Sequence, residues 1–329
     1  MGALHHKPRS PLVPRGSWYG PVFTVAILGV LAAYMTVERF SAVNPATTSA
    51  PANATAAESI AWTKYTELPS IPTGLQEPEA LAVGPDGVVY IGGDRKVRIF
   101  RNGSPELEYV VPGRPHCLAV AAGGTVYVGF RDYVGVYDPR GRLLTNFVSL
   151  GLRAFLTALV TDGSSVWAAD AGDRVVLHYD LHGKVLGRLG AASADQPDQQ
   201  LVVPSPYLGL ALGAAGLLVA NPGRHQVDLY GTDGAWKKAW GKAAESVDGF
   251  CGCCNPTHLA LLPDGRVVTA EKGRPRVKVY FPDGHLESVV AGEQYFRPET
   301  VGLALATDAQ GRIYVLDPSR RAVRVFARK

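Results

Sequence analysis

The sequence predicts an all-β domain built from six copies of one short antiparallel unit, preceded by an apolar N-terminal segment. The clearest copy, NPTHLALLPDGRVVTAEKGRPRVKVY, starts at Asn255 and contains three apolar or alternating runs separated by turn residues. Alternation with a period of two between turn residues is typical of β-strands. Units of this length that recur along a chain are typical of propeller blades. The predicted fold is therefore a six-bladed β-propeller.

The other copies repeat the same order of runs and turns. They begin near Glu77, Arg114, Phe155, Ser205 and Arg297. The turn glycines of the six copies are Gly87, Gly124, Gly163, Gly216, Gly265 and Gly311. A blade buries its faces only by stacking on its neighbours, so a closed ring is the stable assembly.

The last copy supplies only three strands before the chain ends at Lys329. An open ring would leave an unpaired sheet edge. The segment from Trp62 to Leu68 alternates and lies just ahead of the first inner strand. We therefore expect Trp62 to Leu68 to complete the last blade as its fourth strand, giving a propeller over residues 62–329.

Two further features recur at matching places in the copies. A proline stands before the innermost strand at Pro78, Pro115, Pro206, Pro256 and Pro298. A polar residue follows the second strand at Asp170, Asn221, Glu271 and Asp317. This pattern resembles the NHL-repeat family of six-bladed β-propellers, and the resemblance covers roughly Trp62 to Arg328. It implies the fold and leaves the function open, because propellers host many unrelated functions.

Composition agrees with an ordered domain and excludes one class of partner. Hydrophobic residues make up 47% of the chain and charged residues 19%, with a formal net charge of +4. No run of Lys and Arg forms a basic stripe with aromatic stacking positions. We therefore expect no nucleic-acid partner.

The chain ahead of the repeats divides into three parts. Residues 1–17 form a basic tail that contains LVPRGS, a thrombin recognition sequence, so the tail is either a tag remnant or a native flank. Residues 18–37 carry no charge over about the 20 residues that a membrane helix needs, which predicts a transmembrane signal anchor. A buried helix and a cleaved signal peptide are the alternatives. Residues 38–61, rich in Ala, Thr, Ser and Pro, predict a flexible linker.

The flanking charges predict the orientation of this anchor. The tail carries Lys7, Arg9 and Arg15 and no acidic residue. Positive flanks stay in the cytoplasm, so we expect a single-pass membrane protein with a cytoplasmic N-terminus. The propeller would then be extracytoplasmic, and periplasmic in a bacterium. A tethered propeller of this kind is expected to meet a protein partner in a membrane complex.

Loops that enter the innermost strands are expected to meet at one mouth of the central channel. The residues of these loops that we expect to bind a ligand are Glu79, His116, Tyr207 and Glu299. Glu79 and Glu299 come from neighbouring blades and can hold a hard cation such as Ca²⁺. They can equally pair with Arg114 and Arg297.

All four cysteines also fall on two of these loops. With one histidine they form the candidate metal ligands, which are Cys117, Cys251, Cys253, Cys254 and His258. Thiolates and imidazoles favour soft or borderline metals, so Cu or Zn is the expected ion. The alternatives are a structural disulfide, inert buried thiols or thiol redox chemistry.

The predicted fold, membrane anchor and mouth residues are compatible with two classes of function. The one we favour is a membrane-tethered binding or scaffold module whose Cys/His cluster binds a soft metal or is redox-active. The other is an enzyme with its active site at the channel mouth, because the resemblance extends to metal-dependent amidating lyases and, more distantly, to lactonase-like hydrolases. Those families use His or acidic ligands from several blades. Here two mouth positions carry His and two carry Glu, and the absence of a regular set of three imidazoles counts against the lyase.

Overall fold

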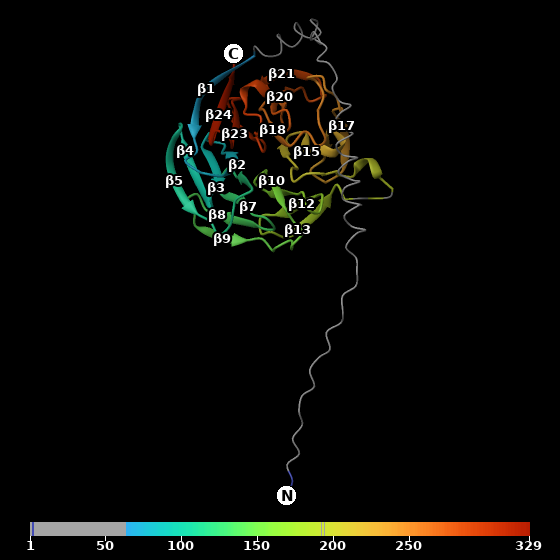
Figure 1. The fold of residues 1–329 in the computed structure, drawn as a ribbon. Coiled ribbons are helices and arrows are strands. Elements are labelled where there is room, and N and C mark those ends of the chain that lie inside the picture. The colour runs from blue at the N-terminus through green and yellow to red at the C-terminus, as the bar shows by residue number, and fades with distance from the viewer. Residues whose placement is uncertain (1, 3–63, 192, 194) are drawn as a thin grey trace. The chain divides into compact units, whose positions relative to one another are not determined.

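The computed structural model describes residues 2, 64–191, 193 and 195–329 (Figure 1). The predicted membrane anchor over residues 18–37 and the linker over 38–61 lie outside this part of the chain, as does the basic tail apart from Gly2. In the described part, no helix has the length and apolar character that a membrane crossing requires.

The described chain folds into six four-stranded antiparallel sheets arranged as a ring (Figure 1). Blade 1 contains β2 (Pro78–Val83), β3 (Val89–Gly93), β4 (Lys96–Arg101) and β5 (Ser104–Val110). Blade 2 contains β6 (Cys117–Val120), β7 (Val126–Gly129), β8 (Val134–Tyr137) and β9 (Leu143–Asn146). Blade 3 contains β10 (Leu156–Thr161), β11 (Ser165–Asp170), β12 (Val175–Asp180) and β13 (Val185–Leu189).

The second half of the ring has the same order. Blade 4 contains β14 (Leu210–Gly213), β15 (Gly216–Asn221), β16 (Gln226–Tyr230) and β17 (Trp236–Trp240). Blade 5 contains β18 (His258–Leu261), β19 (Val267–Glu271), β20 (Arg276–Tyr280) and β21 (Leu286–Ala291). Blade 6 contains β22 (Ala304–Thr307), β23 (Ile313–Asp317), β24 (Ala322–Arg328) and β1 (Tyr65–Pro72). In the described part of the chain, the connections contain the short 3-10 helices η2 (Pro197–Gln199), η3 (Pro222–Arg224) and η4 (Glu293–Tyr295). The predicted six-bladed all-β architecture is confirmed.

The sixth blade joins the two ends of the described chain. β1 pairs antiparallel with β24 as the outermost strand, and the two lie side by side in Figure 1. Arg324 adds two contacts of 2.7 Å to the carboxylate of Glu67 on β1. β1 contains Tyr65 to Leu68 of the segment expected over Trp62 to Leu68 and continues to Pro72, while residues 62 and 63 lie outside the described part of the chain.

The core lies between the blades because each sheet buries both faces against its neighbours. All six residues of β11 are buried, whereas all four of the edge strand β9 are exposed. Tyr127 of blade 2 packs with Leu156 and Val166 of blade 3 in one apolar cluster. Burying one large apolar side chain contributes about 1.5–3 kcal/mol, so this stacking is the main force that closes the ring.

Buried polar residues at the ends of the second strands hold the mouth loops in place. The Asp170 carboxylate accepts a hydrogen bond of 2.9 Å from the backbone N–H of Phe155. Asn221 accepts one of 2.9 Å from the backbone N–H of Val202. Both side chains are almost fully buried, so these bonds are shielded from water. The polar position that recurs in the sequence therefore positions the loops that carry the candidate site.

Candidate functional site

The innermost strands β2, β6, β10, β14, β18 and β22 line a central channel. Leucines narrow it at the waist, where a cavity of about 60 Å³ remains. The channel opens to about 390 Å³ at the mouth formed by the loops entering these strands, and to about 250 Å³ at the opposite end. The mouth cavity contains five titratable side chains, namely Glu79, Arg114, His116, Tyr207 and His258. The opposite end is lined by none.

The mouth cavity brings together most of the side chains that sequence analysis proposed for ligand binding. Glu79, His116 and Tyr207 line it. His258, proposed as a metal ligand, also lines it. Glu299 is exposed and is not part of its lining, so the structure does not place it with Glu79 as a shared cation site.

His116 and Glu79 form a hydrogen-bonded pair at the wall of this cavity. His116 lies just before β6, where its backbone N–H donates to the Gly129 carbonyl at 2.8 Å. Its Nδ1 lies 2.5 Å from Glu79 Oε1, and its ring packs 4.8 Å from the ring of Phe155. This arrangement orients the imidazole and leaves Nε2 available to a ligand.

Glu79 is held as a carboxylate by its partners. Burial disfavours its charged form, but the hydrogen bond and charge of His116 and the charge of Arg114 outweigh burial and lower the pKa of Glu79. Arg114 contacts Glu79 and also binds Glu77 at 2.9 Å. The pair therefore consists of an anionic carboxylate bonded to an imidazole.

His258 faces the same cavity from blade 5. It begins β18, its ring lies edge-on to Tyr207 with centroids 5.6 Å apart, and its Nδ1 lies 3.2 Å from Thr257 Oγ1. Desolvation lowers the pKa of His258 to about 4, and the distant charge of Glu79 opposes this only in part. His258 is therefore a neutral imidazole near pH 7. Burial raises the pKa of Tyr207, which keeps its hydroxyl protonated.

The five residues proposed as metal ligands divide among four places. Cys117 is buried in the core between blades 2 and 3, where desolvation raises the pKa of its thiol. Cys251 is also buried, with its sulfur 3.2 Å from Arg276 Nη2. Among residues 64–329, within the described positions, no group of three or more His, Cys, Asp or Glu side chains is arranged to hold a metal ion. The expected shared Cu or Zn centre is not assembled in this arrangement.

Cys253 and Cys254 stand apart from the other two cysteines. Their sulfur atoms lie 2.7 Å apart on the connection from β17 to β18, which borders the mouth. Cys253 is exposed and Cys254 is buried. Of the proposed set, these two thiols are the pair that the fold brings into contact.

A buried ion cluster beneath this connection was missed by sequence analysis. Glu271 lies 2.6 Å from Arg276 Nη2 and 2.7 Å from Lys278 Nζ, and the side chains of Glu271 and Lys278 are fully buried. Lys278 also donates to the Gly249 carbonyl at 2.7 Å. Burial lowers the pKa of Lys278 to about 8 although Glu271 opposes this shift. The available signal was the presence of charges inside the apolar alternation of β19 and β20.

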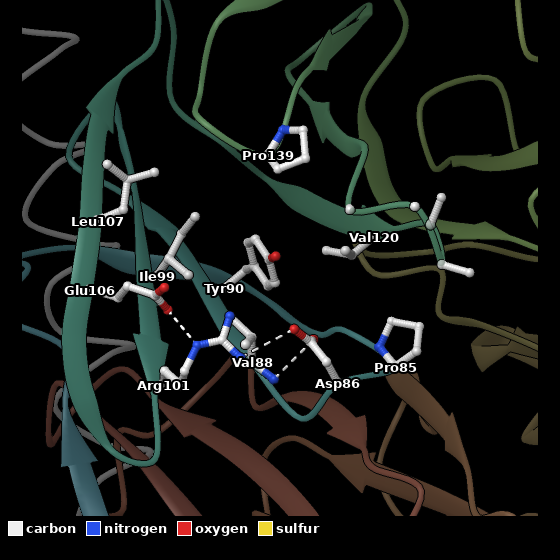
Figure 2. Close-up of a pocket in the computed structure, with 14 residues that line it drawn as sticks. Pro85, Asp86, Val88, Tyr90, Ile99, Arg101, Glu106, Leu107, Val120 and Pro139 are labelled. Carbon is white, nitrogen blue, oxygen red and sulfur yellow. Dashed lines mark hydrogen bonds and ion pairs between the residues drawn. The ribbon is translucent and has the colours of Figure 1, made fainter.

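A larger hollow lies between blades 1 and 2 on the turn side of the ring. Its volume is about 620 Å³, and Figure 2 shows Arg101 between two acidic side chains there. Arg101 binds Glu106 at 2.9 Å and Asp86 at 3.4 Å. These exposed charges are paired with one another, so none of the three is an unpaired charge that a ligand could bind. We therefore place the candidate site at the channel mouth.

Comparison with known proteins identifies the fold. No protein-family model matches this sequence, and no curated protein matches it. A solved streptogramin B lyase superposes with a TM-score of 0.58 at 10% identity, covering 82% of this chain and 99% of that one. Virginiamycin B lyase from Staphylococcus aureus superposes with a TM-score of 0.51 at 14% identity, covering 77% of this chain and 81% of that one. The chain shares the propeller fold of these lyases.

The mouth cavity has the components that acid–base chemistry requires. A carboxylate orients the imidazole of His116, whose second nitrogen can exchange a proton with a bound molecule. Across the cavity, Tyr207 offers a hydroxyl proton and His258 a neutral ring nitrogen. The leucines at the channel waist limit the access of water from below. A small molecule bound here would therefore meet a base and a proton donor.

Proposed function

We propose that the mouth cavity is the active site of a lyase-type enzyme acting on a small molecule, with His116 as the general base. The observation that carries the proposal is the 2.5 Å contact between His116 Nδ1 and Glu79 at the wall of a cavity of about 390 Å³. Small-molecule sites typically have volumes of about 300–1,000 Å³. The propeller fold shared with two lyases supports the same reaction class.

Each side chain has a distinct role in this proposal. His116 takes a proton through Nε2, and the Glu79 carboxylate stabilises the imidazolium that forms. Tyr207 is the candidate acid that protonates the leaving group, because burial keeps its hydroxyl protonated. His258, neutral near pH 7, accepts or donates one hydrogen bond and orients the substrate. An elimination needs a base and an acid on opposite sides of the breaking bond, and these residues supply both.

The test is turnover by the full chain, starting with streptogramin B compounds. Once one is converted, we expect His116→Gln to lower kcat by about 10²–10⁴-fold, as for loss of a general base. Glu79→Gln should lower kcat with little change in KM, because it acts on the base and not on the substrate. Arg101→Gln in the hollow of Figure 2 is the matched control and should leave kcat unchanged. Full turnover by His116→Gln would refute the assignment.

A second candidate function is a scaffold that binds a protein partner. The observation that favours it is a pair of exposed apolar side chains, Val148 at 81% and Leu152 at 94%, on the connection from β9 to β10. This connection lies on the mouth side. If it docks a partner, Val148→Ser with Leu152→Ser should release that partner from crosslinked membrane complexes, whereas His116→Gln should not. Retention of the complex by the double variant would argue against a docking role.

We also propose that residues 18–37 anchor the chain in a membrane with the propeller outside the cytoplasm. The support is the uncharged stretch of about 20 residues and its basic N-terminal flank. Protease added to sealed vesicles should cut the linker over 38–61 only from the extracytoplasmic side. Cleavage from the cytoplasmic side would contradict the proposed orientation. Release of the intact chain by carbonate washing would contradict the proposed membrane anchor.

A further inference from the structure

Cys253 and Cys254 form a contact pair that the acid–base proposal does not use. Their sulfur atoms are 2.7 Å apart, compared with about 2.05 Å in a disulfide bond. Both thiols are free, with Cys253 exposed to solvent and Cys254 beneath it. The two cysteines are neighbours in the chain, so a bond between them would close an eight-membered ring, and the resulting disulfide would be strained and easily reduced.

The two thiols differ in their access to solvent. Cys253 is exposed, whereas Cys254 is buried. The pair therefore contains one accessible thiol that can attack a disulfide and one shielded thiol that can resolve the mixed disulfide.

The connection that carries the pair is fixed from below. Asn255 Nδ2 donates to the Cys251 carbonyl at 2.6 Å, and Asn255 Oδ1 accepts from the backbone N–H of Lys272 at 2.9 Å. Lys278, fully buried, donates to the Gly249 carbonyl at 2.7 Å. Desolvating such charges opposes folding, and packing alone would not require them. The cluster holds in place the connection that carries the two thiols.

The pair also lies close to the candidate active site. Lys272, which interacts with Cys254, places its ammonium 5.4 Å from the centre of the Tyr207 ring. Tyr207 lines the mouth cavity. Lys272 therefore links the thiol pair to a residue of the mouth cavity.

We propose that Cys253 and Cys254 are a reversible two-electron redox pair that exchanges with small-molecule disulfides. The Cys253 sulfur, after losing its proton, attacks one sulfur of the small disulfide, forms a mixed disulfide and releases one thiolate. The Cys254 thiolate then attacks the Cys253 sulfur, forms the bond between the two cysteines and releases the second thiolate. The protein loses two electrons and two protons, and the small disulfide leaves as two thiols. This proposal is independent of the lyase chemistry.

The experiment uses the reduced full chain and oxidised glutathione as the probe. We expect the wild-type protein to lose two hydrogen atoms in intact mass and two alkylatable thiols, and dithiothreitol should restore both. Peptide mapping should place the bond between Cys253 and Cys254. Cys254→Ser should instead accumulate a stable glutathione adduct on Cys253, because the resolving thiol is gone. Cys253→Ser should react much more slowly, because Cys254 is buried.

Matched controls separate this role from general thiol reactivity. Cys117→Ala changes a thiol buried in the core and should leave the reaction unchanged. Circular dichroism before and after oxidation should be superimposable, since the pair lies on a connection outside the sheets. If the wild-type protein keeps a glutathione adduct as Cys254→Ser does, or if the bond maps to Cys251, the proposal is wrong.

Discussion

Two histidines in one cavity have different immediate neighbours. His116 shares a hydrogen bond with the ionised Glu79, which orients its ring. His258 has no carboxylate within hydrogen-bonding distance among the described residues and lies in a desolvated wall, so its protonation is disfavoured. A carboxylate partner suits the residue that takes up a proton, whereas a desolvated imidazole is suited to hydrogen bonding in its neutral form.

The lowered pKa of His258 predicts how the free energy of unfolding depends on pH. Its pKa in the folded state, about 4, lies below the ordinary value of 6.5. Between these values the unfolded chain binds a proton that the folded chain does not, so stability falls as the pH falls through this window and is unaffected above it. The loss should reach about 3 kcal/mol at most, since one pKa unit corresponds to about 1.4 kcal/mol.

The measurement is urea unfolding at several pH values between 7.5 and 4.5. His258→Gln should show a shallower loss than the wild-type protein across this range. His285→Gln changes an exposed histidine and should behave like the wild type. Glu79, whose folded-state pKa is lowered from 4.5, contributes stability that is lost only below that value, so it does not mask the effect. If the free energy of unfolding of His258→Gln changed with pH in the same way as that of the wild type, the lowered pKa of His258 would be contradicted.

The strands β19 and β20 show how one element supports a neighbouring loop. Glu271 ends β19, Arg276 begins β20 and Lys278 lies within it, and together they hold the connection over residues 241–257 against blade 5. Buried charges of this kind are stable only while all partners are present. The connection that carries the thiol pair therefore depends on side chains well away from it in sequence.

The substitution Glu271→Leu tests whether the buried ion cluster stabilises the connection over residues 241–257. Removing the carboxylate leaves Arg276 and Lys278 buried without their anion, so we expect a loss of about 3–5 kcal/mol in the free energy of unfolding. Hydrogen exchange should rise over residues 242–254 before it rises in β19. The control is Glu106→Gln, which breaks an exposed pair with Arg101 and should change stability by about 0–1 kcal/mol. Equal effects of the two variants would show that the cluster does not stabilise the loop.

Residues 65–328 form a ring that is closed by the pairing of β1 with β24. β1 covers the edge of β24, and no other strand of the described chain can do so in this topology. The Glu67 and Arg324 pair further fixes the register. An uncovered β24 would present unpaired backbone groups to other chains.

Two truncated chains test whether the ring needs β1 for its closure. A chain that starts at residue 64 retains β1 and should remain monomeric with a single cooperative unfolding transition. A chain that starts at residue 73 lacks β1 and should aggregate or dimerise through β24. Size-exclusion chromatography and light scattering at matched concentration distinguish the two. A monomeric, equally stable chain from residue 73 would show that the ring does not need this strand.

Local patterns were enough to predict the blades, because period-two alternation and turn residues act between sequence neighbours. The closing strand was also predictable, since the copy at Arg297 ends one strand short. Glu79, His116 and Tyr207 could be assigned to one mouth because each lies just ahead of or at the start of an inner strand, and the topology of a ring brings those positions together.

Tertiary structure alone decided which of those side chains meet. His116 and Cys117 are adjacent, yet His116 faces the mouth cavity and Cys117 packs into the core between two blades, because successive residues along a strand point to opposite faces. His258 turns to Tyr207 instead of the cysteines, and Cys251 turns to Arg276. Such contacts depend on the path of the connection between β17 and β18 and on its buried ion cluster. Both depend on side chains that are distant in sequence, so local sequence patterns do not predict them.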